Sequence, residues 1–420
     1  MAKLFHTVVI GGGCLGCASA FSLSRRLGKK PGKVAIIEKK ILGAGLSSRH
    51  SAIVRSANAS TMAARMAKIA TQQWKNLDSL WGIDIQFEQP GAIWIAGNPQ
   101  ASPTHPWQRL EQTMQQEGIE LNRVSYKEVE QLCQGTIRLS PEEMYLYEPD
   151  VLQLDSSEIL HTLQEAAKRN RIEVIEHCQV HDFEPDNQGH IVALQTNQGS
   201  ISCENVVNAA GGWSADLFAS LDIHLPVALE AVYAANFLVS SQDVPASLPI
   251  IADFVNRAYF RRWRGSILHM HQPRSRAPND IARSFGRAMM NPEGANLIYD
   301  ASSFSVNHEQ LTQYVTKVEN RFPKLGKPVY AGGYQSFFDI TPDLKFILGT
   351  DTKTPNLFHC LGAGQALKYA PVMGEVIADL VIDGKVNDTG VNISEFSIRR
   401  FEGKALDNYW KSKAVEISAL

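Results

Sequence analysis

A glycine-rich turn between an apolar strand and a helix constrains the fold of this chain more than any other sequence feature. Residues 5–10 form an apolar run typical of a buried strand, residues 14–27 carry apolar positions at helical spacing, and residues 33–38 form a second apolar run. The turn contains three glycines with G-x-G-x-x-G spacing, Gly11, Gly13 and Gly16. Together these features predict a βαβ unit that binds a dinucleotide, because glycine lets the backbone approach a pyrophosphate at the positive end of the helix.

An acidic residue at the end of the second strand supports this interpretation. Glu38 follows the glycine turn by about 20 residues, the position from which a carboxylate accepts hydrogen bonds from the ribose hydroxyls of an adenosine. A 2'-phosphate would be repelled there. The alternative, a tight strand-to-helix turn without a ligand, accounts for the glycines but not for the acidic residue.

Length and composition limit the remaining possibilities. The chain has 420 residues, which suits two closely packed domains, and 44% of them are apolar. The formal net charge of -2 gives no basic excess, so nucleic-acid binding is not expected. The first apolar strand begins near Phe5 and leaves no room for a signal peptide, and no uncharged apolar run reaches the ~18 residues of a membrane span. We therefore expect a globular, cytoplasmic protein without a transmembrane segment.

The cysteines point to thiols rather than disulfides or metal ligands. The six cysteines are scattered without a repeating ligand spacing, which fits reduced thiols in a cytoplasm. Cys14 and Cys17 have C-x-x-C spacing, but they fall in the glycine turn and the following helix, where small buried residues are expected. No metal site is therefore predicted.

The periodicity of apolar residues predicts further elements. Residues 91–96 and 190–203 have strand character, and Asn187-Gln188-Gly189 is typical of the turn in an antiparallel pair. Between about 226 and 330, strand-like pieces alternate with a polar loop at 273–296, which indicates a separate lobe facing the substrate. The predicted helices lie at about 60–80, 105–118, 156–170, 307–321 and 372–382, the last beginning just after Pro371 and ending before Gly384.

These elements predict an α/β chain of the α+β two-domain type in which the domains are interleaved. A Rossmann-like first domain with a parallel sheet is expected from residues 1–85, 140–225 and 326–420. Residues 86–139 and 226–325 are expected to form the second domain, which binds the substrate on a mixed, largely antiparallel sheet.

Five motifs in order along the chain carry a family resemblance. They are GGGCLG at 11–16, GLSSRHSAIVRS at 45–56, VVNAAGGWS at 206–214, ITPD at 340–343 and GAGQALKYAPVMG at 362–374. This set resembles the D-amino-acid-oxidase-like FAD oxidoreductases, in particular the branch of sarcosine oxidase β subunits, glycine oxidases and amino-acid dehydrogenases. The resemblance spans almost the whole chain, and only residues 273–310 have no counterpart.

The resemblance implies that FAD is bound in an extended form. The glycine turn would hold the pyrophosphate, Glu38 the ribose and the backbone near Val180 the adenine. Relatives attach flavin to a histidine near the position of His50, or to a cysteine near the position of Ser336, but the residues flanking His50 differ here and Ser336 is no thiol. Noncovalent FAD is therefore favoured, with a flavinylated His50 as the alternative. The implied cofactor residues are Gly11, Gly13, Gly16, Glu38, Lys39, Ser47, Ser48, Arg49, His50, Val180, Ala210, Gly211, Trp213, Gly362, Gly364 and Lys368; for Arg49 a plain surface position is the alternative.

The resemblance also implies a carboxylate-binding pair. Arg55 matches the family arginine that holds the substrate carboxylate, and a planar guanidinium suits that role through paired hydrogen bonds. Lys368 matches the lysine at the closing edge of the same pocket, although either cation alone could be a structural ion-pair partner.

One strand pair of the substrate domain supplies further candidates. The segment 259–271 resembles the substrate-lobe strand that faces the flavin, with Tyr259, Arg261, His269 and His271 as candidates and His271 ranked first. Because side chains alternate along a strand, Tyr259 and Arg261 share one strand face, and so do His269 and His271. A structural role is at least as good an account of each.

The function that the resemblance implies is oxidation of the C–N bond of a small amino acid or N-methyl amino acid such as sarcosine, glycine or a proline-like acid. Hydride passes to flavin N5, and water hydrolyses the imine; no protein base at the reacting carbon is required. Backbone amides near Gly362 and Gly364 and the start of the following helix are expected to stabilise negative charge on the flavin.

Three points stay open in this interpretation. Sarcosine oxidases carry a lysine at the position of Ile267 that promotes reaction with oxygen, so a dehydrogenase is favoured over an oxidase. The alternatives are an FAD-dependent 2-hydroxy-acid dehydrogenase, and an FAD-carrying assembly or scaffold subunit with little turnover. Partners would be a small amine substrate that bears a carboxylate, and a possible electron acceptor or hetero-oligomer subunits.

Overall fold

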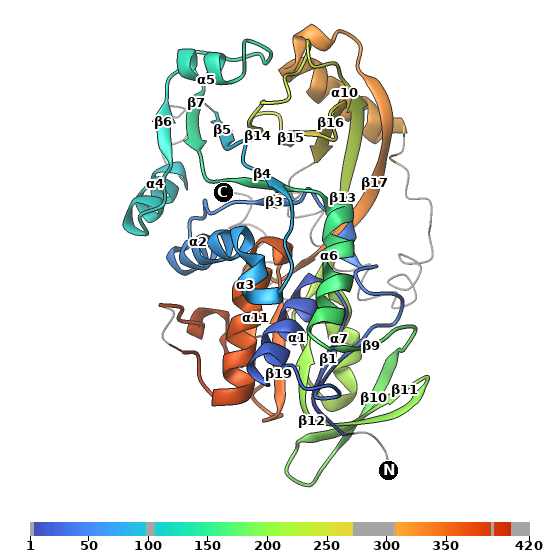
Figure 1. The fold of residues 1–420 in the computed structure, drawn as a ribbon. Coiled ribbons are helices and arrows are strands. Elements are labelled where there is room, and N and C mark those ends of the chain that lie inside the picture. The colour runs from blue at the N-terminus through green and yellow to red at the C-terminus, as the bar shows by residue number, and fades with distance from the viewer. Residues whose placement is uncertain (1–3, 98–105, 272–305, 307, 388–389, 405–420) are drawn as a thin grey trace.

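The computed structural model describes residues 4–97, 106–271, 306, 308–387 and 390–404. Within these residues the chain forms two lobes, each built on a sheet of eight strands, with the first lobe at the bottom of Figure 1 and the second at the top. A third, small antiparallel sheet consists of β3 (Ile53–Val54), β8 (Leu152–Leu154) and β4 (Phe87–Glu88). The expected two-part α/β fold with mixed sheets is confirmed.

The sheet of the first lobe has a parallel centre. Its order is β10-β11-β12-β1-β2-β9, with β19 paired to β12 and β18 paired to β19. β1 pairs in parallel with both β2 and β12, and the apolar run Val8–Ile10 that predicted it is buried. The strands are β1 (Leu4–Ile10), β2 (Val34–Ile37), β9 (Glu173–Ile175), β10 (Val180–Pro185), β11 (Ile191–Thr196), β12 (Gly199–Asn208), β18 (Ile347–Thr350) and β19 (Leu357–Leu361).

Two helices from opposite ends of the sequence pack together against this sheet. α1 (Cys14–Arg26) and α11 (Ala366–Asp383) share a core with β1, β2 and β19, and their backbones approach closely. A Cβ on Gly374 of α11 would lie 2.6 Å from the carbonyl group of Ala18 in α1, so glycine is required at this crossing. The contact brings the two ends of the predicted cofactor site into one lobe. Nearby helices of this lobe are α2 (Thr61–Lys75), α3 (Leu77–Trp81), α6 (Ser156–Arg169) and α7 (Ser214–Leu217).

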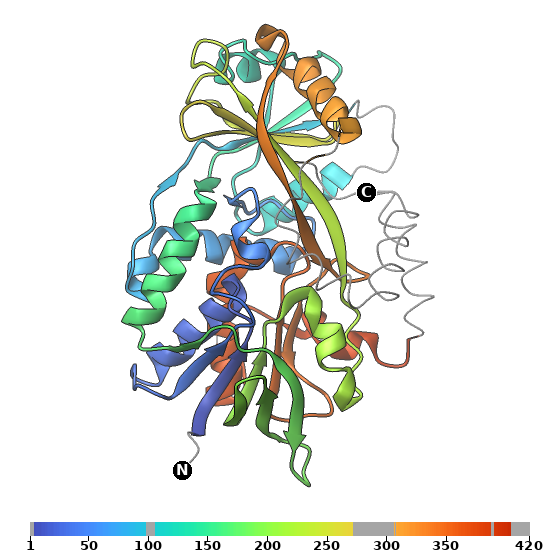
Figure 2. The ribbon, with the colours of Figure 1, turned by 90° about the vertical axis from the view of Figure 1, so that its right-hand side faces the viewer.

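The sheet of the second lobe is mixed and largely antiparallel. Its order is β17-β13-β16-β15-β14-β5-β7-β6, and only β5 and β14 pair in parallel. β13 and β17 are long strands that run from the upper lobe down to the lower one (Figure 2). One face of the sheet packs on α10, where Phe260 and Met270 join Tyr314 in a buried cluster. The elements are β5 (Ala92–Ala96), β6 (Asn122–Val124), β7 (Met144–Glu148), β13 (Ala228–Leu238), β14 (Ile250–Asp253), β15 (Ala258–Trp263), β16 (Ile267–His271), β17 (Val329–Ile340), α4 (Pro106–Gln116), α5 (Tyr126–Leu132) and α10 (His308–Arg321).

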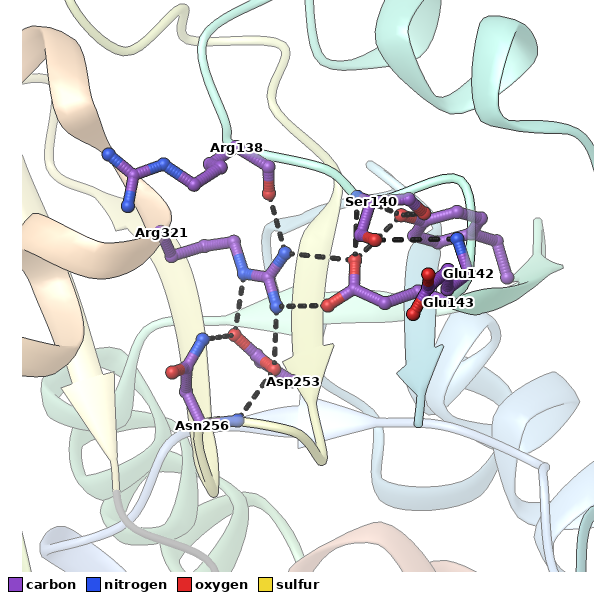
Figure 3. Close-up of polar contacts among 8 residues, drawn as sticks. Arg138, Ser140, Glu142, Glu143, Asp253, Asn256 and Arg321 are labelled. Carbon is purple, nitrogen blue, oxygen red and sulfur yellow. Dashed lines mark hydrogen bonds and ion pairs between the residues drawn. The ribbon is translucent and has the colours of Figure 1, made fainter. Parts of the chain in front are cut away.

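A buried arginine ties α10 to this sheet (Figure 3). Arg321 is 3% exposed, and its guanidinium donates to both carboxylate oxygens of Asp253, at 2.7 and 3.0 Å, and to Glu143 at 3.1 Å. It also donates to the carbonyl oxygen of Arg138. The charge is thus balanced by two carboxylates and by a backbone acceptor, which is what a buried guanidinium needs to be tolerated inside a protein.

The structure differs from the sequence-based expectations in several places. The last long helix begins at Ala366 and contains Pro371, so the prediction that it begins after this proline is wrong. A proline inside a helix removes one backbone hydrogen bond, and here the buried apolar face of α11 outweighs that loss. The expected domain boundaries would assign β7 and the whole of β17 to the first domain, whereas both strands join the second sheet; a division by residue number stays a prediction. The loop at 273–296 lies outside the described residues. Among the helices that the structure describes, none combines the length and the apolar character needed to cross a membrane.

Candidate active site

The glycine turn has the shape that a bound pyrophosphate requires. Gly11 has a φ of +102°, which side-chain-bearing residues rarely adopt, and a Cβ on Gly16 would lie 1.9 Å from the carbonyl oxygen of Gly11. The strand therefore turns directly into α1 with backbone packed on backbone. At the start of the helix the Cys14 amide donates to the Ser47 hydroxyl at 2.8 Å, which brings the predicted segment 45–50 against the turn. Cys14 and Cys17 are buried in α1, and burial raises the pKa of the Cys14 thiol to about 11.

Glu38 braces this turn from the end of β2. One of its carboxylate oxygens accepts from the Gly12 amide and the other from the Lys40 amide, both at 2.8 Å. Its side chain lines the cavity described below, and each oxygen retains a lone pair for a further donor. The arrangement fits a ribose diol, because the carboxylate is held in place by the same turn that would receive the neighbouring phosphates.

A cavity of about 420 Å³ connects the two ends of the predicted cofactor site. It extends from Val180 past the glycine turn to Asp339, Cys360 and Ala366, where α11 begins. This lining suits an extended dinucleotide, because the phosphate turn and the start of the C-terminal helix, the two segments expected at such a site, border the same cavity. The residues named from the sequence that line it are Gly11, Gly13, Glu38, Lys39, Ser47, Val180, Ala210, Gly211 and Trp213.

Other predicted cofactor residues lie outside this lining. Gly16 packs beneath the turn, Ser48 donates to the carbonyl oxygen of Gly45, and Arg49 is exposed. The amides of Gly362 and Gly364 donate to Asp339, at 3.3 and 2.9 Å. Both amides therefore bond to a carboxylate, and the expectation that they stabilise charge on a flavin stays a prediction.

Asp339 is a residue that sequence reasoning missed. It ends β17, lines the cavity and holds the loop 362–364 in place through those two bonds. Asp339 directly precedes the ITPD motif at 340–343, and this position is the sequence signal that could have identified it.

The strand pair β15 and β16 gathers all four substrate-lobe candidates on one face of the second sheet. Tyr259 lies opposite His271, and Arg261 lies opposite His269. Directly opposed residues share a sheet face, so the side chains of the β15 pair, Tyr259 and Arg261, and those of the β16 pair, His269 and His271, point to the same face. The face opposite to theirs carries Phe260 and Met270 of the α10 core. His50 lies in the same region, because its ring accepts from the Ala52 amide, the Ala52 carbonyl oxygen accepts from the Leu154 amide, and Arg261 donates to Leu154.

The histidines of this region are neutral. Burial, and to a lesser extent the charge of Arg261, lowers the pKa of His271 to about 4 and that of His50 also to about 4. The pKa of His269 is lowered well below its ordinary value for the same reasons. Burial lowers the pKa of Arg261 to about 10, which leaves it charged at neutral pH.

The charges of Arg55 and Lys368 both act on a buried carboxylate that the sequence did not single out. Glu148 is 0% exposed, and burial raises its pKa while the charges of Arg55 and Lys368 lower it. It accepts from the amides of Ser56 and Ala57 at 2.7 and 2.9 Å. No periodicity or motif marks Glu148 in the sequence, because its partners are distant along the chain.

Aromatic rings connect this carboxylate to the sheet face. The Trp94 indole donates to Glu148 at 3.2 Å, and the Arg55 guanidinium lies 4.8 Å from the centre of the Trp94 ring. Trp94 stacks on Phe254, and Phe254 contacts Tyr259 edge to face. The predicted carboxylate-binding pair and the predicted substrate strand therefore border one continuous wall.

Comparisons with known proteins agree with this architecture. The chain is 26% identical to 4-methylaminobutanoate oxidase (formaldehyde-forming) of Paenarthrobacter nicotinovorans over 98% of its own length and 47% of that protein. It is 23% identical to the mitochondrial pyruvate dehydrogenase phosphatase regulatory subunit of Mus musculus, over 94% and 43%. The chain thus spans about half the length of these curated relatives. The crystal structure of L-proline dehydrogenase from P. horikoshii superposes with a TM-score of 0.79 at 19% identity, covering 96% of this chain and 99% of that one.

The family comparison covers most of the chain. The family model described as DAO, FAD dependent oxidoreductase, matches residues 6–380, a range that includes the glycine turn, Glu38, Arg55 and Lys368. The chain therefore belongs to the DAO family of FAD-dependent oxidoreductases, and FAD is its cofactor.

Proposed function

We propose that this protein oxidises the C–N bond of a small amino acid or N-methyl amino acid. The observation that carries the proposal is that Arg55 packs on the Trp94 ring whose indole donates to the buried carboxylate of Glu148, and that the charges of Arg55 and Lys368 both act on this carboxylate. Two cations around one anion leave a net positive charge, which suits a substrate carboxylate. The guanidinium of Arg55 would hold that carboxylate through two parallel hydrogen bonds, and Lys368 would close the pocket from the start of α11.

The surrounding residues would prepare the amine of the substrate. The charges of Arg55, Lys368 and Arg261 disfavour a positively charged ammonium group nearby and therefore favour the uncharged amine. His271 is neutral and adds no further positive charge, so its ring can contact the substrate by hydrogen bonding. Tyr259 would set the position of the substrate on the sheet face, since its ring is fixed against Phe254.

FAD would be held without a covalent bond. When bound, it accepts the hydride that leaves the carbon next to the amine, and water then converts the resulting imine to a carbonyl compound and a free amine. The glycine turn would hold the pyrophosphate and Glu38 the ribose. The amides at the start of α11, which the structure leaves without a side-chain cap, would face the negative end of the flavin. His50 would be an uncharged neighbour of the ring.

A dehydrogenase is favoured over an oxidase in this proposal. Ile267 lies opposite Trp263 on the same strand pair, at the position where an oxygen-promoting lysine is expected in sarcosine oxidases. Such an enzyme passes its electrons to an acceptor other than oxygen, and a partner subunit could supply that acceptor.

The substrate class draws support from one relative, and an alternative draws support from another. The name of 4-methylaminobutanoate oxidase describes an N-methyl amino acid as the substrate of that relative. The phosphatase regulatory subunit bears the name of a regulatory protein, which keeps an FAD-carrying subunit with little turnover as the second candidate.

Anaerobic flavin absorbance tests the proposal. The purified protein with bound FAD is titrated with sarcosine, glycine, proline, N-methyl amino acids and 2-hydroxy acids, and air is then admitted. We expect bleaching by an amine-bearing acid, a large loss of affinity in Arg55→Gln, and slow return of colour in air. Bleaching by hydroxy acids alone would replace the proposal with hydroxy-acid oxidation, and bound flavin that nothing bleaches would favour the regulatory candidate.

A further inference from the structure

Arg261 is a buried charge whose balancing anion is absent from the described part of the chain. Arg261 is 2% exposed, and among the described residues its guanidinium donates one hydrogen bond, to the carbonyl oxygen of Leu154 at 3.1 Å. The Nε atom is buried and bonds to no acceptor among the residues that the structure describes. The groups whose charge raises its pKa are Tyr334, Asp155 and Glu88, and none of them forms an ion pair with Arg261 among the described residues; Asp155 pairs with Arg264.

The same lobe shows how a structural arginine is buried in this protein. Arg321 has nearly the same exposure as Arg261, but it donates to Asp253 and Glu143 and is held by both carboxylates (Figure 3). A buried guanidinium without such partners is costly, because desolvation removes its water and nothing replaces it. Arg262, the next residue of β15, is also buried without a carboxylate partner among the described residues, but it points to the other sheet face and donates to the Ser241 hydroxyl and the carbonyl oxygen of Gly265. The place of Arg261 on the face that carries the other site candidates, together with the contrast to Arg321, favours a ligand as the anion that balances it.

A second donor accompanies Arg261. The His50 Nδ1 atom accepts from the Ala52 amide at 2.9 Å, so in the neutral ring the proton lies on Nε2. This Nε2 is buried and has no acceptor among the described residues. Hydrogen bonds connect the two groups through β8, because the Leu154 amide donates to the Ala52 carbonyl oxygen at 2.8 Å and Arg261 donates to the Leu154 carbonyl oxygen. An N–H and a guanidinium that converge in this way are suited to an oxyanion.

We propose that Arg261 and the Nε2–H group of His50 form a second anion subsite, which takes the second carboxylate of a dicarboxylic amino acid. The inference rests on the proposed function, because the first carboxylate of the substrate is the one assigned to Arg55. The reacting amine and carbon would lie between the two subsites, over the sheet face that carries Tyr259 and His271.

The register of the second sheet gives the two subsites a suitable separation. Trp94, against which Arg55 packs, lies opposite Ala252, and Ala252 lies opposite Tyr259, two residues before Arg261. Trp94 and Arg261 are separated by two strand spacings, from β5 across β14 to β15, and by two residues along β15. This puts their Cα atoms about 12 Å apart. A separation of this order would suit a four- or five-carbon diacid held between the two guanidinium groups.

Ligand binding to the oxidised holoenzyme tests this subsite without turnover. The absorbance of bound FAD is recorded during titration with succinate and, separately, with propionate, which is succinate with one carboxylate replaced by hydrogen. The readout is the ratio of the two dissociation constants in wild type, Arg261→Gln and Arg261→Lys. Arg262→Gln is the matched control, because it removes the same charge from the next residue of β15, whose side chain points to the other face of the sheet.

We expect wild type to prefer succinate, and Arg261→Gln to lose about tenfold to a hundredfold of that preference, the value of hydrogen bonds to a charged group. Arg261→Lys should retain part of the preference and Arg262→Gln all of it. FAD content and thermal melting of each variant show whether it is folded.

Two results would overturn the inference. One is a wild type that binds succinate no better than propionate. The other is an Arg261→Gln variant with an unchanged ratio but an altered flavin reduction potential, which would make the cofactor the partner of Arg261. The proposed function is judged separately: Arg261-dependent succinate binding in a protein that no amino acid reduces would refute the amine chemistry and leave the subsite standing.

Discussion

Replacement of Glu148 by glutamine probes the buried carboxylate that links the two lobes. Glu148 is at the end of β7 and is 0% exposed, yet all three of its hydrogen bonds come from N–H donors: the amides of Ser56 and Ala57 and the indole of Trp94. A carboxylate can accept from all three, whereas a glutamine side chain has one oxygen and an NH₂ group. In Glu148→Gln one donor must therefore face another donor.

The size of the effect follows from the bonds that change. Hydrogen bonds to a charged acceptor contribute about 1.5–3 kcal/mol each and those between neutral groups about 1 kcal/mol, and a buried donor without an acceptor costs a further 1–3 kcal/mol, roughly. With two bonds weakened, one lost and one buried donor left without an acceptor, we expect the free energy of unfolding to fall by at least about 3 kcal/mol. The loss of a counter-ion for Arg55 and Lys368 acts in the same direction.

Urea denaturation of the FAD-bound protein, followed by tryptophan fluorescence, measures this change. Glu130→Gln on the exposed side of α5 is the matched control and should leave the midpoint unchanged. Because a two-lobe protein with a cofactor need not unfold in one step, the comparison rests on midpoints measured under identical conditions. A Glu148→Gln midpoint equal to that of the control would refute the reasoning, since it would mean that Glu148 carries a proton.

Three further predictions follow from the same structure. Gly16→Ala should abolish FAD retention, since its Cβ would lie 1.9 Å from the Gly11 carbonyl oxygen. Gly97→Ala, whose Cβ would have no atom of the described residues within 4 Å, should retain FAD, and equal flavin content in the two variants would contradict the prediction. Arg321→Met should lower the free energy of unfolding by about 3–5 kcal/mol, the cost of leaving a buried carboxylate unpaired, and a loss below about 1 kcal/mol in urea melts would count against it. The pKa of His271, about 4, lies below the value of 6.5 in an unfolded chain, so its contribution to stability is present above pH 6.5 and is lost as the pH falls toward 4. We expect about 2 kcal/mol of the free energy of unfolding to be lost between pH 7 and 5. His271→Asn should remove that part of the pH dependence, and equal slopes in the variant and the wild type would disprove the prediction.

Local signals in the sequence were sufficient for the first part of the fold. The apolar runs and the three glycines predicted β1, α1 and β2, because strand and helix periodicity and the demand for small residues are properties of a short segment. Glu38 was predicted for the same reason. The start of α11 was missed, because Pro371 is a strong local signal that long-range packing overrides.

Pairings between distant segments could not be predicted from the sequence. Glu148 and Asp339 are single acidic residues whose partners lie on other strands and loops, so nothing near them in the chain distinguishes them. Arg261 and His271 were named, but their common face depends on the register of β15 and β16, which the turn at Gly265 sets. Charge balance at Arg261 became visible only once its neighbours were known.

A single-turnover experiment tests the central claim most directly. The FAD-bound protein is mixed anaerobically with one equivalent of an N-methyl amino acid, and the bleached flavin, the carbonyl product and the released amine are quantified together. The account predicts equal amounts of all three and loss of the reaction in Arg55→Gln. Flavin that stays oxidised with every amine-bearing acid, or that is reduced without release of an amine, would contradict it.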